Sequence, residues 1–283
     1  MSSPPPTRCG QTEFRWGERT YVMGICNLSP DSFAGDGLGD DIGAAVAQAK
    51  RMVAEGADII DIGGESTRPG TEPLTADDTR EELRLVIPAI ERLAAELTVP
   101  LSIDTYHSEV ARRAVEAGAS MVNDIWGLKR DPEVARVAAE AGVPLIMMGN
   151  QRDAPPRVGI MAKVISDMEA SISLAVKAGV SEDNIIIDPG IGFGKTLEQN
   201  LELINRLDEL RQLGKPVLLG TSRKSVIGTV LDLPSDQRLE GSLATVAIGI
   251  ARGADMVRVH DVRETVRVCR MSDAIIRRGT VGD

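Results

Sequence analysis

Residues 58–70 read DIIDIGGESTRPG, a short apolar run that ends in glycine and continues with acidic, hydroxyl and basic residues. A run of this length closed by glycine is typical of a buried β-strand that leads into a loop. Similar apolar runs recur along the chain, and they read YVMGICN, PLSIDT, SMVNDI, PLIMMG, NIIIDPG, PVLLGTS and MVRVHD. The sequence therefore predicts eight short strands with polar residues at their carboxyl ends.

Segments with helical periodicity separate these strands, for example at 41–57, 79–97 and 241–254. Local signals agree, because Gly142 is placed as a helix stop and Thr196 and Gln199 have the spacing of a capping box. Eight strand-then-helix repeats in 283 residues predict an α/β fold, a single (β/α)8 TIM barrel.

The barrel is expected to occupy residues 13–283 as one domain. Segment 14–21, FRWGERTY, is expected to form a short N-terminal hairpin that covers the bottom of the barrel. The residues before it begin MSSPPPTRCG and contain no apolar run, so a disordered tip is predicted at 1–12.

Composition excludes several classes of partner. The formal net charge is -10, and such a surface repels a phosphate backbone, so no nucleic acid is expected. The cysteines, Cys9, Cys26 and Cys269, are odd in number and lack C-x-x-C spacing, which argues against a disulfide framework or a zinc cluster. No stretch approaches the roughly 18 apolar residues of a membrane span. These features predict a soluble cytoplasmic protein without membrane contact.

Polar residues at the strand ends form the strongest functional signal. Side chains alternate along a strand, so if Asp104 faces the barrel axis, Ser102 does too. Other strand ends in the same register supply Asn27, Asp61, Asn123, Asp188, Arg258 and His260. Any one of these residues could merely cap a helix, but burying them all unpaired would cost about 1–3 kcal/mol each. Because these ends meet at the face where TIM barrels carry out catalysis, a polar ligand is expected there.

The residue types indicate the chemistry of that ligand. Carboxylates and amides suit an edge rich in N–H donors, such as that of a 2-aminopyrimidinone. Arg68, Arg258 and His260 suit a diphosphate, and Asn27 could hold a hydrated magnesium ion beside it. The segment GIGFGKT at 190–196 is not a P-loop, because Pro189 stands where the first glycine is required. We expect a glycine-rich loop that lets a ring lie near the backbone.

Seven motifs occur in one order along the chain, namely MGICNLSPDSF, DIGGESTRPG, SIDT, VNDI, DPGIGFGK, GTSRKS and RVHDV. In these motifs the chain resembles the dihydropteroate synthases, pterin-binding TIM-barrel enzymes, from about residue 14 to residue 276. The resemblance implies a transferase of folate biosynthesis and a target of sulfonamides. Enzymes of that family join 6-hydroxymethyl-7,8-dihydropterin diphosphate to p-aminobenzoate, giving 7,8-dihydropteroate and pyrophosphate.

The resemblance also implies residue roles. The pterin would be bound by Asp104, Asn123, Asp188 and Lys224, with Asp61 in the same pocket. The diphosphate would be held by Arg68, Arg258 and His260, with Asn27 as a ligand of Mg²⁺. Around p-aminobenzoate would lie Phe33, Thr67, Pro69, Phe193, Ser222 and Arg223. Asp104, Lys224 and Arg68 would take part in catalysis, and a homodimer is implied.

Two departures from the family pattern keep alternatives open. Gly149 stands where the family commonly has His, and in the first loop Gly35 takes the usual Asp position while Asp36 follows it. These departures would suit a non-catalytic pterin-binding paralogue. A pterin-dependent methyltransferase of the same superfamily is another alternative, but it would not need ESTRPG or SRK. The retained strand-end residues favour the synthase.

Overall fold

A computed structural model describes residues 3–29, 38, 41–64, 76–153 and 159–277. Its central sheet has eight strands in the order β8-β7-β6-β5-β4-β3-β10-β9, with parallel pairing throughout. The strands are β3 (Tyr21–Asn27), β4 (Ile59–Gly63), β5 (Leu101–Asp104), β6 (Met121–Asp124), β7 (Leu145–Met148), β8 (Ile185–Asp188), β9 (Leu218–Leu219) and β10 (Met256–Val259). A bridge between Ile187 and Val217 joins the two edge strands. The predicted barrel and its eight strands are confirmed.

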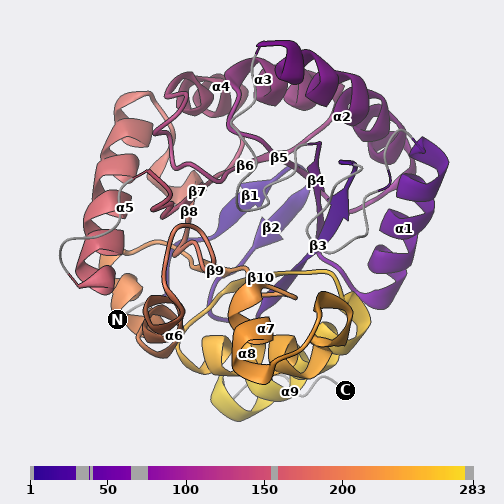
Figure 1. Cartoon of the computed structure of the whole chain (residues 1–283). Helices are drawn as coiled ribbons and strands as arrows, with labels where there is room; N and C mark the ends of the chain where they lie inside the picture. The colour runs from indigo at the N-terminus through magenta and orange to yellow at the C-terminus, as the bar shows by residue number, and fades with distance from the viewer. Residues whose placement is uncertain (1–2, 30–37, 39–40, 65–75, 154–158, 278–283) are drawn as a thin grey trace.

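Helices surround this sheet on the outside, as Figure 1 shows. They are α1 (Ile42–Glu55), α2 (Ala76–Glu96), α3 (Ser108–Ala117), α4 (Glu133–Ala141), α5 (Ile160–Lys177), α6 (Leu197–Asn205), α7 (Ser225–Leu231), α8 (Leu239–Ala251) and α9 (Val262–Ile276), with short 3-10 turns at Glu182–Asn184, Leu207–Leu213 and Ser235–Gln237. The predicted end signals are present. Gly142 ends α4 in the left-handed conformation, and Thr196 with Gln199 forms a capping box at α6. Among the described residues, no helix combines the length and apolarity that a bilayer span requires.

Strand side chains alternate between two apolar layers. Outward residues such as Ile60 and Ile62 pack against the helices, and Cys26 belongs to this layer. Inward residues such as Met23 and Ile59 fill the lower half of the barrel. Because Cys26 points outward, the next residue along β3, Asn27, points toward the barrel axis.

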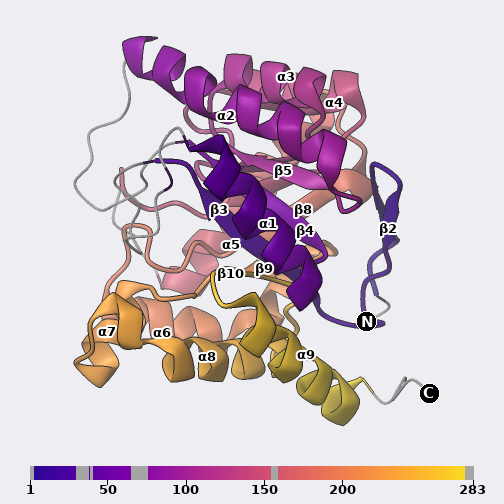
Figure 2. The ribbon, with the colours of Figure 1, turned by 90° about the vertical axis from the view of Figure 1, so that its right-hand side faces the viewer.

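An antiparallel hairpin of β1 (Thr7–Cys9) and β2 (Thr12–Phe14) covers the bottom of the barrel. Figure 2 shows it at the opposite end from α7. Phe14, with Trp16 and Tyr21, forms an aromatic cluster that joins the barrel interior. The expected hairpin therefore exists at 7–14 and not at 14–21, and the disordered tip does not extend to residue 12. The physical reason is that Thr7 and Cys9 are buried: the Trp16 Nε1–H donates to Thr7 Oγ1 at 2.9 Å, and Cys9 packs in the same apolar cluster as Phe14.

Candidate active site

Arg258 from β10 reaches across the mouth of the barrel to two carboxylates. Its Nε donates to Asp61 Oδ2 at 2.6 Å, and its Nη2 donates to Asp104 Oδ2 at 2.7 Å. Asn123 Nδ2 donates to the same Asp61 oxygen at 3.1 Å. Strands β4, β5, β6 and β10 thus bring their predicted polar residues into one hydrogen-bonded group.

Two polar atoms beside this group are buried without a hydrogen-bond partner among the described residues. They are Asp61 Oδ1 and Ser102 Oγ, and Asp61 and Ser102 are direct neighbours in the register of β4 and β5. The inward position of Ser102 agrees with the predicted alternation. Buried polar atoms that lack partners are expected to receive them from a ligand or from ordered water.

Asp188 and Lys224 lie at the other side of the mouth. Asp188 is buried and accepts the backbone N–H of Gly190 at 2.7 Å, and burial raises its pKa against the opposing charge of Lys224. Lys224 Nζ donates to the Ile191 carbonyl at 2.7 Å, and burial lowers the pKa of Lys224 to about 8 although Asp188 opposes this. A buried carboxylate and a half-buried amine therefore lie on the same side of the mouth.

Gly220 shows that the two sides of the mouth are continuous. A Cβ built on Gly220 would lie 3.7 Å from Asp188 Oδ2, 3.7 Å from Lys224 Nζ and 3.8 Å from Arg258 Cβ. The glycine at the end of the seventh barrel strand therefore leaves space where these three side chains converge. A side chain at position 220 would contact all three groups.

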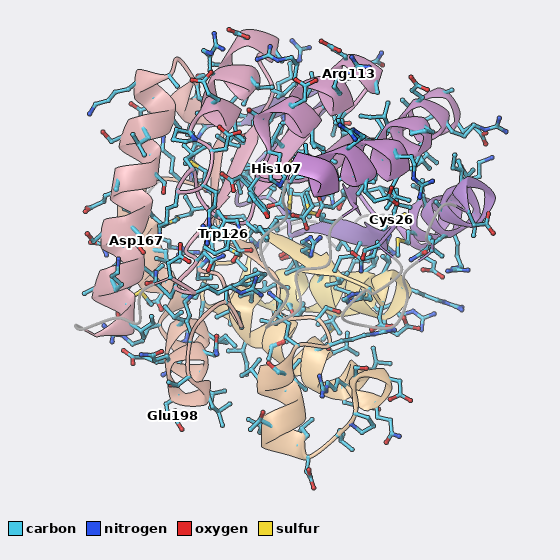
Figure 3. The ribbon with its side chains drawn as sticks, turned by 45° about the horizontal axis from the view of Figure 1, so that its top comes forward. Cys26, His107, Arg113, Trp126, Asp167 and Glu198 are labelled. Atoms are coloured by element: carbon cyan, nitrogen blue, oxygen red, sulfur yellow. The ribbon has the colours of Figure 1, made fainter. Side chains whose placement is uncertain are left out.

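An apolar wall stands beside the polar groups. It consists of Tyr106, Ile125, Trp126, Met148 and Phe193, all of which are buried. Lys224 Nζ lies 4.7 Å from the centre of the Phe193 ring, so the wall adjoins the carboxylate–ammonium pair. Figure 3 shows Trp126 inside the ring of helices, whereas Glu198 lies on its outer edge. The mouth thus offers an aromatic surface for stacking next to hydrogen-bonding groups.

Two arginines flank the wall, and the sequence analysis did not identify them. The Arg130 guanidinium lies 4.2 Å from the Trp126 ring centre, and the Arg152 guanidinium lies 4.6 Å from the Phe193 ring centre. Neither arginine belongs to a predicted strand end, so alternation along strands could not have indicated them.

Ser222, Arg223 and His260 meet at the carboxyl ends of β9 and β10. Ser222 Oγ and His260 Nδ1 are 2.9 Å apart, and the His260 backbone N–H donates to the same hydroxyl at 3.2 Å. Arg223 pairs with Asp261 through its Nε at 3.0 Å and its Nη2 at 2.5 Å. Asp261 was missed in the sequence analysis, where it appeared only within MVRVHD and RVHDV. The pairing orients Arg223, which has a positive φ of 57°.

Asn27 lies half-buried at the end of β3. It flanks Gly63 together with Asp104, since a Cβ built on Gly63 would lie 3.9 Å from Asn27 Oδ1 and 3.6 Å from Asp104 Cβ. Phe33, Thr67, Arg68 and Pro69 lie outside the described residues, as do Gly35 and Asp36. Within the described part of the chain, no group of three or more His, Cys, Asp or Glu side chains is arranged to hold a metal ion.

Gly149, the departure after the fifth barrel strand, faces away from the polar groups. A Cβ built there would meet the Pro189 carbonyl at 3.2 Å and Val164 Cγ1 at 3.3 Å. Val164 is a buried residue of α5 in the apolar layer between the strands and the helices. A His side chain at position 149 would therefore start toward Pro189 and Val164 and not toward Asp188 or Asn123.

The sequence and the fold have close relatives. Residues 23–260 match the model of a family described as pterin binding enzymes. A dihydropteroate synthase of Clostridium beijerinckii is 51% identical over 96% of this chain and 100% of its own length, and that of Bacillus subtilis is 52% identical over 93% and 91%.

Solved structures agree with this match. A Clostridium difficile dihydropteroate synthase crystallised in the presence of pteroic acid superimposes with a TM-score of 0.88 at 49% identity, covering 93% of this chain and 99% of that one. A Xanthomonas albilineans dihydropteroate synthase in complex with 7,8-dihydropteroate gives 0.85 at 40% identity, covering 96% and 98%. The chain belongs to the family of pterin binding enzymes.

Proposed function

We propose that the protein is a dihydropteroate synthase. It transfers the pterinylmethyl group of 6-hydroxymethyl-7,8-dihydropterin diphosphate to the amine of p-aminobenzoate and releases pyrophosphate. The observation that carries the proposal is the convergence of Asp188, Lys224 and Arg258 around the space left by Gly220, beside a buried aromatic wall. The relatives with about 50% identity support it over nearly their whole length.

The pterin ring occupies the space next to Gly220 in this proposal. Asp188 and Asn123 accept and donate hydrogen bonds along the aminopyrimidinone edge, and Lys224 donates to a ring acceptor. Asp104 and Asp61 line the same pocket, where Arg258 forms an ion pair with each of them. Burial strengthens each of these interactions, because little water remains to compete with them.

The chemical step breaks the bond between the methylene carbon and the diphosphate oxygen, whose electron pair leaves with pyrophosphate. The positive charge left on the pterinylmethyl group is delocalised into the electron-rich ring, and the Asp104 carboxylate stabilises it. The lone pair of the p-aminobenzoate nitrogen then forms the new C–N bond, and that nitrogen passes a proton to the released pyrophosphate. Arg68, Arg258 and His260 hold the departing diphosphate in this scheme.

Mg²⁺ is proposed as the cofactor, with Asn27 as its protein ligand. One amide oxygen beside Asp104 suits a magnesium ion that keeps most of its waters and takes its remaining ligands from substrate phosphates. When bound, the ion neutralises charge on the leaving group.

The p-aminobenzoate site is formed by Phe193, Ser222 and Arg223, together with Phe33, Thr67 and Pro69. Phe193 offers the face of its ring, and Ser222 with Arg223 suits the carboxylate. An arylamine is already neutral at pH 7, so the site needs to orient the nucleophile and not to deprotonate it.

A homodimer formed through the late helices is also proposed. Helices α6 to α9 carry most of the large apolar side chains that are exposed in the described residues, including Leu201, Val230, Ile248, Met271 and Ile275. Such a surface is typical of an interface between copies. Sedimentation should therefore show twice the monomer mass, and Ile248→Asp should lower it. A cytoplasmic location is proposed because Cys9, Cys26 and Cys269, all described, are not joined by disulfides.

The decisive experiment measures pyrophosphate release by the purified protein with magnesium and dihydropterin diphosphate, with and without p-aminobenzoate. Mass detection of dihydropteroate establishes the synthase. Pterin binding without product would instead identify a non-catalytic paralogue. Asp188→Asn is the matched loss-of-binding variant, and it should abolish pterin binding in calorimetry while the far-UV spectrum is unchanged. If that variant unfolds, Asp188 is a structural residue.

A further inference from the structure

Lys195 places its ammonium among backbone carbonyls. Its Nζ donates to the carbonyl oxygens of Gly149 at 2.5 Å, Gly190 at 2.7 Å and Phe193 at 3.2 Å. An ammonium has three donors, so these carbonyls use all of them. Among the described residues, no carboxylate pairs with Lys195, so its interactions are made to the main chain.

The three carbonyls belong to two separate loops. Gly149 follows β7, whereas Gly190 and Phe193 lie in the loop after β8. The loops are also joined by a hydrogen bond from the Gln151 N–H to the Phe193 carbonyl at 3.2 Å. A Cβ on Gly190 would approach the Gly149 oxygen to 2.5 Å, so only glycine allows this contact. Lys195 therefore holds together two backbones that touch directly.

These loops carry the wall of the mouth. The Phe193 ring lies beside Lys224. Met148, which directly precedes Gly149 in the chain, belongs to the same apolar cluster as Phe193. The carbonyl of Phe193 itself is one of the atoms that Lys195 holds. A change in Lys195 therefore reaches the Phe193 ring through one residue of backbone.

Keeping a charge at this position is costly. Burial lowers the pKa of Lys195 to about 7. The negative charges of Asp188 and Asp167 oppose this lowering, and the positive charges of Lys224 and Lys129 add to it. Yet the Gly149 carbonyl accepts from no other donor in the described part of the chain. A lysine whose only partners are loop carbonyls serves the conformation of those loops, and a P-loop lysine would instead face a phosphate.

We propose that Lys195 is a positioning residue for p-aminobenzoate, which acts by fixing the loops after β7 and β8 so that Phe193 presents its ring to the substrate. This rests on the proposed synthase function. Lys195 does not touch either substrate. Two pterin groups, Asp188 and Lys224, also contact the loop after β8, at Gly190 and Ile191. Loss of Lys195 therefore weakens p-aminobenzoate binding more than pterin binding, since Lys195 holds the Phe193 carbonyl directly.

The test compares Lys195→Met, which removes the donors and keeps the length, with Lys195→Arg, which keeps the charge. Lys177→Met, on the exposed surface of α5, is the matched control. Lys195→Met should raise the KM for p-aminobenzoate about tenfold, because several hydrogen bonds to a charged group are lost. The dissociation constant of the pterin should change less than about threefold. Lys195→Arg should fall between Lys195→Met and the parent.

Amide hydrogen exchange supplies a readout that does not need turnover. Residues 149–151 and 190–195 should exchange faster in Lys195→Met than in the parent, and the control should not differ. An unchanged KM with unchanged exchange would overturn the proposal, as would equal losses of pterin and p-aminobenzoate binding. If Lys195→Met does not fold, Lys195→Arg decides by the same criteria. If the parent makes no dihydropteroate, the synthase function fails, while the exchange comparison still judges the role of Lys195 in the loops.

Discussion

Replacing Arg258 by Met should lower the free energy of unfolding by about 3–5 kcal/mol, because the change leaves buried carboxylates without their cation. Arg258 lies 2.6 Å from Asp61 and 2.7 Å from Asp104. The Asp61 side chain is fully buried, whereas that of Asp104 is 10% exposed. Without Arg258, Asp61 keeps one N–H from Asn123 as its donor among the described residues. Because solvent reaches Asp104, we expect the lower end of the range, about 3 kcal/mol.

Urea unfolding followed by far-UV circular dichroism measures this loss. The double variant Arg258→Met with Asp61→Asn should recover about 1–3 kcal/mol relative to the single variant, since it removes the unpaired charge. Arg263→Met, an exposed arginine at the start of α9, is the control and should stay within about 0.5 kcal/mol of the parent. A loss below about 1 kcal/mol for Arg258→Met, or no recovery in the double variant, would show that the charges are not coupled in the folded protein.

Two further predictions follow from other buried groups. Asp124 accepts the backbone N–H groups of Trp126 and Leu128 at 2.7 Å each, so Asp124→Asn should cost about 1–3 kcal/mol in denaturant titrations. Burial raises the Asp124 pKa from 3.8 to about 6. The contribution of Asp124 to the free energy of unfolding is therefore fully present below pH 4 and declines as pH rises through 6. The cost of Asp124→Asn should be roughly 2–3 kcal/mol larger at pH 4 than at pH 8, and an equal cost at both pH values would refute the assignment. Burial also raises the pKa of Cys9 and of Cys269 to about 12, so a thiol reagent should label them only at the rate of unfolding, and fast labelling at native pH would contradict this.

The arrangement of the barrel was predictable because period-two alternation carries over from strand to strand. If Asp104 faces inward, the same parity places Asp61, Asn123 and Asp188 at one mouth, and their burial agrees. The hairpin was misplaced for a local reason. Its strands have only three residues each, and Thr7 is buried by packing that a three-residue pattern does not reveal.

Contacts across the barrel were not predictable. Arg258 and Asp61 are 197 residues apart in the chain, and whether they meet depends on the tilt and stagger of the strands. Lys195 shows a second limit. Its acceptors are backbone carbonyls, which every residue possesses, so no pattern of side chains marks its role. The sequence indicated only that GIGFGKT is not a P-loop.

Charge balance in the mouth explains why the diphosphate half of the site needs groups beyond this cluster. Asp61, Asp104 and Asp188 face Arg258 and Lys224, and three carboxylates against two cations leave one negative charge in excess among these five side chains. Arg258 already donates to two of those carboxylates. A diphosphate brings several more negative charges, so this cluster alone would repel it. The proposed reaction therefore requires additional positive charge at the leaving group, and this is the physical reason for assigning it Mg²⁺ together with Arg68.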